Sequence, residues 1–121
     1  MKTEALLSQI IAITQEHRAQ DLTILKVTEV CEFADYFVIM SGTSSIHIQT
    51  IAEKVLYHCK HMGHPAISVE GLAASEWCLL DFGAVIVHVF RPEKRAHYQL
   101  EALWKDAETL APESLVSSSS P

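Results

Sequence analysis

The spacing of apolar residues changes along the chain, and each change predicts a different element. Between residues 3 and 19, apolar side chains recur at every third or fourth position, which predicts an amphipathic helix lying on a sheet. Residues 22–27 alternate between apolar and polar side chains, as a half-buried strand does. Residues 35–40 are apolar throughout after Asp35, which is typical of a central strand covered on both faces.

A second helix is predicted between residues 44 and 62, where apolar side chains again follow helical spacing. Its start is marked by the Ser- and Thr-rich segment 41–45, whose hydroxyl groups are candidate N-caps. Its end is marked by Gly63, a favoured C-terminal cap, and by Pro65, which prevents the helix from continuing. A third strand is expected at residues 66–69, followed by a turn and a loop.

Residues 77–90 contain two short apolar runs joined by a glycine, and they predict a tight antiparallel hairpin. With a loop formed by Phe82 and Gly83, Leu80 lies opposite Val85, and the two-residue period sorts the side chains onto two faces. The first face is aliphatic and is expected to be core: Cys78, Leu80, Val85, Val87 and Val89. The second face mixes aromatic, aliphatic and ionisable groups: Trp77, Leu79, Asp81, Ile86, His88 and Phe90.

A last helix is expected to begin at residues 91–93, since proline is favoured in a first helical turn. Its apolar stripe consists of Ala96, Leu100, Leu103, Trp104 and Ala107. The resulting order α-β-β-α-β-β-β-α predicts an α/β fold with a mixed five-stranded sheet and flanking helices. Residues 1–110 form a single domain in this interpretation, and residues 111–121 form a disordered Ser-rich tail.

Composition and charge restrict the classes of protein that this fold can serve. No apolar run reaches the about 18 to 20 residues of a membrane span, so no membrane partner is expected. The N-terminus lacks a signal-peptide core, which favours the cytoplasm, or an organelle matrix if a leader has been removed. Three scattered cysteines without CxxC spacing suit a reducing compartment. The net charge of -6 argues against sequence-specific nucleic-acid binding and favours a basic protein partner.

Two candidate chemical sites compete with simpler structural roles. Free amides at the helix start after segment 41–45 could hold a phosphate, but no GxGxxG or P-loop motif is present, and capping is favoured. His58 and His61 share a helical face, yet a closed zinc site needs four ligands, and histidines suit a helix C-terminus. No paired catalytic carboxylates or nucleophile motif accompany them. We therefore predict no enzyme, cofactor or metal, with a nucleotide-binding or nucleotidyl-transferring enzyme at residues 41–45 as the alternative.

The second face of the hairpin offers a different kind of site. Together with Tyr98, the residues Trp77, Asp81 and His88 would form an aromatic surface with one carboxylate, which is the composition of a protein interaction hot spot. The alternative is that Trp77 packs beneath the N-terminal helix and that Tyr98 is an isolated surface aromatic. Periodicity and composition leave both possibilities open.

The combined motifs closely resemble those of the ribosomal silencing factor family, also called Iojap-like proteins. The segments that carry the resemblance are ADYFVIMSGTSSIHIQTIAEKV, then the EG pair, then WCLLDFGAVIVHVFRPEKRAHYQLEALWKDA. They extend over about residues 2–107, and the Ser-rich tail lies outside the family pattern. Position 82 varies in apolar type among such proteins, so Phe82 is expected to alter local packing without removing an apolar contact.

This resemblance implies a homodimer with a fold similar to nucleotidyltransferases, but without their catalytic carboxylates. It also implies binding to the large ribosomal subunit through the ribosomal protein named L fourteen. Such binding would sterically block association with the small subunit and lower translation under nutrient limitation. By matching positions, the resemblance places the contact on Trp77, Leu80, Asp81, Phe82, Arg95 and Tyr98. Leu80 conflicts with the sorting of hairpin faces, which assigns it to the core.

Overall fold

The computed structural model describes residues 2–74, 76–98 and 107–111, which form one mixed sheet with flanking helices. The described helices are α1 (Lys2–Glu16), α2 (Ser45–His61) and α3 (Pro92–Tyr98). The described strands are β1 (Gln20–Lys26), β2 (Tyr36–Ser41), β3 (Ser68–Glu70), β4 (Trp77–Asp81), β5 (Val85–Phe90) and β6 (Glu108–Leu110). They follow the order β3-β4-β5-β2-β1-β6 in the sheet. β2 and β5 pair in parallel, and every other adjacent pair of these strands is antiparallel.

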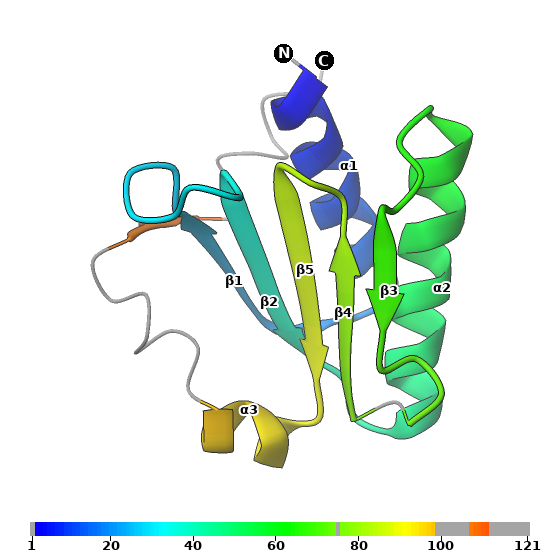
Figure 1. Cartoon of the computed structure of the whole chain (residues 1–121). Helices are drawn as coiled ribbons and strands as arrows, with labels where there is room; N and C mark the ends of the chain where they lie inside the picture. The colour runs from blue at the N-terminus through cyan, green and yellow to red at the C-terminus, as the bar shows by residue number, and fades with distance from the viewer. Residues whose placement is uncertain (1, 75, 99–106, 112–121) are drawn as a thin grey trace.

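Helices α1 and α2 cover one face of the sheet, and α3 lies at the end of the sheet where β2 and β5 finish (Figure 1). The core beneath α1 and α2 contains side chains that are fully buried: Leu7, Ile10, Ile11, Ile48, Ile51, Val55, Val38, Met40, Leu80 and Val87. The predicted amphipathic stripe of α1 is therefore confirmed. β2 is buried along its whole length, which confirms its predicted central position.

The boundaries of α2 agree with the sequence signals. The Ser44 hydroxyl oxygen accepts a hydrogen bond from the His47 backbone N–H at 3.1 Å, so Ser44 is the N-cap. Gly63 follows the helix with a φ of 90°, a left-handed conformation that favours glycine. A Cβ atom on Gly42 would lie 2.6 Å from Cγ1 of Ile48, so the missing side chain lets the start of α2 approach the end of β2.

The β4–β5 hairpin has a different turn from the predicted one. Leu80 lies opposite Val87 instead of Val85, which is a shift of two residues. The loop is Gly83-Ala84: the Phe82 backbone N–H donates to the Val85 carbonyl oxygen at 2.9 Å, and Gly83 has a φ of 87°. Glycine at the first loop position is the requirement of a II′ turn, whose twist matches that of the strands. Because the shift is even, every side chain keeps its predicted face.

The C-terminal part of the sheet also differs from the prediction of five strands. β6 adds a sixth, since Leu110 pairs with Ile24 and Glu108 with Lys26 of β1. Three residues are too few to show a strand period, so only the pairing with β1 identifies this strand. The predicted apolar stripe of the last helix lies outside the residues whose side chains are described, apart from Ala107, which directly precedes β6. The tail boundary and the nucleotidyltransferase-like topology remain predictions.

Candidate partner-binding surface

The sheet face opposite α1 and α2 carries an aromatic cluster of Phe37, Trp77, His88 and Phe90, called here the outer cluster. Trp77 and Phe90 are a directly opposed pair, and their rings stack with centroids 5.0 Å apart at an interplanar angle of 20°. The His88 ring is nearly parallel to that of Phe90, at 8°. Trp77 is half-buried whereas the other three rings are buried, so the cluster reaches the surface through the indole. The alternative that Trp77 packs beneath the N-terminal helix is wrong.

His88 is the buried polar member of the outer cluster, with 5% of its surface exposed. Its Nδ1 atom accepts a hydrogen bond from the Trp77 indole Nε1–H at 3.2 Å. Its Nε2 atom is buried and has no hydrogen-bond partner among the described residues. Burial lowers the pKa of the imidazole from 6.5 to about 4, because a charged ring would lose its hydration. The neutral ring must then carry its proton on Nε2, since Nδ1 is the acceptor.

Arg95 links α3 to β1 and β2 at the end of the sheet where Trp77 lies. Its guanidinium donates to the Ser41 hydroxyl at 3.2 Å, to the Thr23 hydroxyl at 2.9 Å and to the Asp21 carbonyl oxygen at 2.6 Å. The ladder between β1 and β2 is interrupted between Gln20 and Thr23, and such an irregularity leaves backbone groups available to other donors. The resemblance places Arg95 in the partner contact, and in the structure its guanidinium makes these internal hydrogen bonds.

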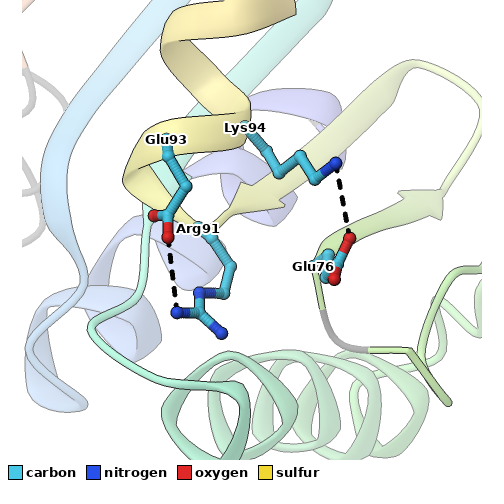
Figure 2. Close-up of polar contacts among 4 residues, drawn as sticks. All are labelled: Glu76, Arg91, Glu93 and Lys94. Carbon is cyan, nitrogen blue, oxygen red and sulfur yellow. Dashed lines mark hydrogen bonds and ion pairs between the residues drawn. The ribbon is translucent and has the colours of Figure 1, made fainter.

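Charged pairs next to Trp77 complete this end of the surface. The Lys94 ammonium lies 3.6 Å from the Glu76 carboxylate, which joins α3 to the residue before β4 (Figure 2). The guanidinium of Arg91, which directly precedes α3, lies 3.4 Å from the Glu93 carboxylate. The Arg91 backbone N–H also donates to the Glu76 carbonyl oxygen at 2.9 Å. Glu76 and Glu93 are exposed, and Arg91 and Lys94 are half-buried. Solvent-accessible pairs of this kind contribute about 0–1 kcal/mol each to stability.

Asp81 and Phe82 occupy the opposite end of β4 from Trp77. Four residue steps at about 3.3 Å each separate Trp77 from Asp81, so the two side chains lie about 13 Å apart along one face. The Asp81 carboxylate is half-buried and accepts a hydrogen bond from the Gly83 backbone N–H at 2.8 Å, which stabilises the turn. Phe82 is buried in the core on the helix side, with 9% of its surface exposed. The expected site therefore consists of two separated parts.

Leu80 and Tyr98 complete the expected set. The Leu80 side chain is fully buried in the core beneath α2, as the sorting of hairpin faces predicts, and a docked partner cannot reach it in this conformation. Tyr98 is the last residue of α3, and its side chain lies outside the described part of the chain. The contact residues implied by the resemblance omit Phe90 and His88, although strand alternation places both on the hairpin face of Trp77 and composition had already grouped His88 with Trp77 and Asp81. The alternation of faces was the signal that could have included them.

The segment at residues 41–45 uses its polar groups within the chain. The Ser44 hydroxyl caps α2, and the Ser41 hydroxyl accepts from Arg95. The Thr43 backbone N–H donates to Nδ1 of His47 at 2.9 Å, and Nε2 of His47 lies 2.8 Å from the His17 carbonyl oxygen, to which it donates. These contacts join the start of α2 to the end of α1, so the capping interpretation is confirmed and the anion-binding alternative gains no support.

Two further sequence questions concern metals and membranes. His61 contacts its own helix: its Nδ1 atom lies 2.9 Å from the Tyr57 carbonyl oxygen, and the imidazole and the Tyr57 ring have centroids 4.2 Å apart. Over residues 2–74, 76–98 and 107–111, no group of three or more His, Cys, Asp or Glu side chains is placed to hold a metal ion. Within the same ranges, each helix is too short or too polar for a bilayer crossing.

Comparison with known proteins supplies the family. The family model described as "Ribosomal silencing factor during starvation" matches residues 1–120. The chain belongs to this family. The match runs past residue 107 into the Ser-rich segment, which the resemblance read from the motifs had left outside the family pattern.

Individual relatives agree with this assignment. The chain is 32% identical over 117 residues to ribosomal silencing factor RsfS of Halalkalibacterium halodurans, a match that covers 97% of this chain and 100% of that protein. It is 33% identical over 101 residues to "Mitochondrial assembly of ribosomal large subunit protein 1" of Mus musculus, covering 81% of this chain but only 44% of that longer protein. A crystal structure of a Chromobacterium violaceum protein matches with a TM-score of 0.84 and 27% identity, covering 87% of this chain and 88% of the other.

Family membership decides the class of function. Ribosomal silencing factors are regulators of translation that associate with the large ribosomal subunit and have no enzymatic activity. The prediction that the chain is not an enzyme is therefore confirmed. A surface that presents a half-buried indole beside charged side chains suits such a role, because protein partners dock on aromatic anchors with polar rims.

Proposed function

We propose that the chain binds the large ribosomal subunit through the ribosomal protein named L fourteen and thereby blocks association with the small subunit. Blocking needs no chemistry, because a bound competitor only has to occupy the docking surface at sufficient concentration and affinity. We further propose that this lowers translation when nutrients are scarce, and that the protein acts in the cytoplasm.

The observation that carries the proposal is the outer cluster, which presents Trp77 at the surface beside α3. Tryptophan is among the residue types that contribute most to binding free energy when a partner buries the side chain. The net charge of -6 complements a basic ribosomal protein and would accelerate the encounter. We assign the direct contact to Trp77, Asp81, Arg95 and Tyr98, with Leu80 and Phe82 supporting β4 from the core side.

Subunit reassociation followed by sucrose-gradient sedimentation tests the proposal. Saturating wild-type protein should reduce the peak of intact ribosomes and co-sediment with large subunits. The double variant Trp77→Ala with Asp81→Ala should lose both effects while retaining its fold. Tyr57→Ala is the matched control, because Tyr57 is an aromatic residue that is 56% exposed on α2, on the other side of the sheet. An undiminished ribosome peak with saturating wild-type protein would overturn the proposal.

A homodimer is part of the same proposal. β3 ends the sheet, and its outer edge pairs with no described strand. The neighbouring Ile67 side chain is 71% exposed and that of Val69 39%, so this edge combines free backbone groups with apolar side chains. Light scattering after size exclusion measures the mass directly. A monomer mass at tens of micromolar protein would exclude the dimer without affecting the proposal on subunit binding.

A further inference from the structure

The hydrogen bond between Trp77 and His88 gives the buried histidine a role in binding. We propose that His88 is a positioning residue, whose Nδ1 atom holds the Trp77 indole flat against Phe90 so that the ring is already oriented for the ribosomal partner. This inference rests on the proposed function, in which Trp77 is the central contact.

The geometry supports a positioning role more than a packing role. The Trp77 and His88 rings are inclined by only 28° and their centroids are 6.1 Å apart, so the two rings lie side by side with the indole N–H directed at Nδ1. The Phe90 ring stacks against the indole with centroids 5.0 Å apart, and the Phe37 ring packs edge-on against the imidazole with centroids 5.4 Å apart. The imidazole is thus held by buried rings while the indole reaches the surface.

A purely structural role would not call for a histidine at this position. Nε2 is a buried donor without a partner among the described residues, which makes the imidazole less favourable there than an apolar ring of similar size. The feature that an apolar ring lacks is the acceptor on Nδ1. The lowered pKa of His88, about 4, keeps the imidazole neutral at physiological pH, so Nδ1 stays available as an acceptor for the indole N–H. A fixed indole loses less conformational freedom on docking, which favours binding.

The test combines binding, stability and a spectroscopic signal in three variants. His88→Phe keeps the aromatic packing but removes the acceptor, whereas His88→Asn places a carbonyl oxygen near the position of Nδ1. Trp77→Phe removes the donor and keeps a ring on Phe90. Loss of one hydrogen bond should weaken co-sedimentation with large subunits about three- to tenfold in His88→Phe, with partial recovery in His88→Asn. The urea midpoint of His88→Phe should not fall, because the orphan donor is gone as well.

Nitrogen-15 NMR follows the indole directly. The sequence contains two tryptophans, so the indole signal that disappears in Trp77→Phe identifies Trp77. In His88→Phe this signal should shift and exchange with solvent at least about tenfold faster, because its acceptor is lost. An unchanged signal would show that the hydrogen bond is absent and would overturn the inference.

A double-mutant cycle separates this inference from the proposed function. If positioning is correct, Trp77→Phe with His88→Phe weakens binding no more than Trp77→Phe alone, because both remove the same interaction. Additive losses, or unchanged binding by His88→Phe while Trp77→Ala binds weakly, would overturn the positioning role and leave the proposed function standing. Unchanged binding by Trp77→Ala would overturn the docking surface itself, and with it the role of His88.

Discussion

Replacing Leu80 by alanine distinguishes a core residue from a contact residue at the centre of the hairpin. The Leu80 side chain is fully buried in the cluster beneath α2, so the substitution leaves a cavity that the surrounding side chains fill only partly. Such changes cost about 2–5 kcal/mol of unfolding free energy. With a urea dependence of about 2 kcal/mol per molar, a loss of about 3 kcal/mol lowers the urea midpoint by about 1.5 M.

Two control variants separate the effect of lost core packing from the effect of a lost partner contact. Leu79→Ala changes the neighbouring residue, which is half-buried on the other face of the same strand, and should cost only about 1 kcal/mol. Leu80→Met keeps most of the volume and should cost less than about 1.5 kcal/mol. Leu80→Met should still co-sediment with large subunits. Leu79 lies between Trp77 and Asp81 on the proposed docking face, so Leu79→Ala is a control for stability alone. If Leu80→Ala keeps the wild-type urea midpoint but no longer binds, Leu80 is a direct contact and its assignment to the core is wrong.

Other expected outcomes concern the start of α2 and the pH dependence of stability. Gly42→Ala should cost about 1–3 kcal/mol in thermal denaturation, because its Cβ atom would lie 2.6 Å from Cγ1 of Ile48; a wild-type melting temperature would contradict this close approach. Ser44→Ala should cost about 1 kcal/mol through loss of the N-cap, whereas Ser45→Ala, one residue inside the helix, should cost much less; equal effects would contradict the cap assignment. For His88, the folded pKa of about 4 lies below the ordinary 6.5, so the unfolded chain binds the proton first as the pH falls. Titration of His88 therefore leaves the free energy of unfolding at its full value above pH 6.5. The free energy of unfolding then falls progressively, by about 3 kcal/mol in total, as the pH drops to about 4. Urea titrations across this range should therefore show a shallower pH dependence in His88→Phe than in wild type, and identical slopes would refute the lowered pKa.

Local signals in the sequence were sufficient where neighbouring residues supply the physical cause. The start and end of α2 follow from a capping hydroxyl at Ser44 and a left-handed glycine at Gly63, both of which act within one helical turn. The faces of β4 and β5 follow from strand alternation, so Leu80 was assigned correctly to the core despite a turn placed one residue too early. An even error in pairing leaves this alternation unchanged.

Contacts between distant segments decided the rest. β6 exists as a strand through its pairing with β1, which lies more than eighty residues earlier in the chain. Arg95 reaches the Asp21 carbonyl oxygen and the hydroxyls of Thr23 and Ser41 through the placement of α3 at the end of the sheet. No periodicity within a window of neighbouring residues records such pairings, because they depend on how the elements are arranged in space.

The candidate surface shows the same division. The sequence by itself determined that Trp77, Asp81 and His88 share one face of a hairpin, since alternation along paired strands is a local property. Only the tertiary structure decided that His88 is buried against Phe37 of β2 and accepts the indole N–H of Trp77, with Asp81 at the far end of the strand. Burial and hydrogen bonding depend on which strands become neighbours, and the parallel pairing of β2 with β5 joins segments that α2 and two further strands separate in the chain.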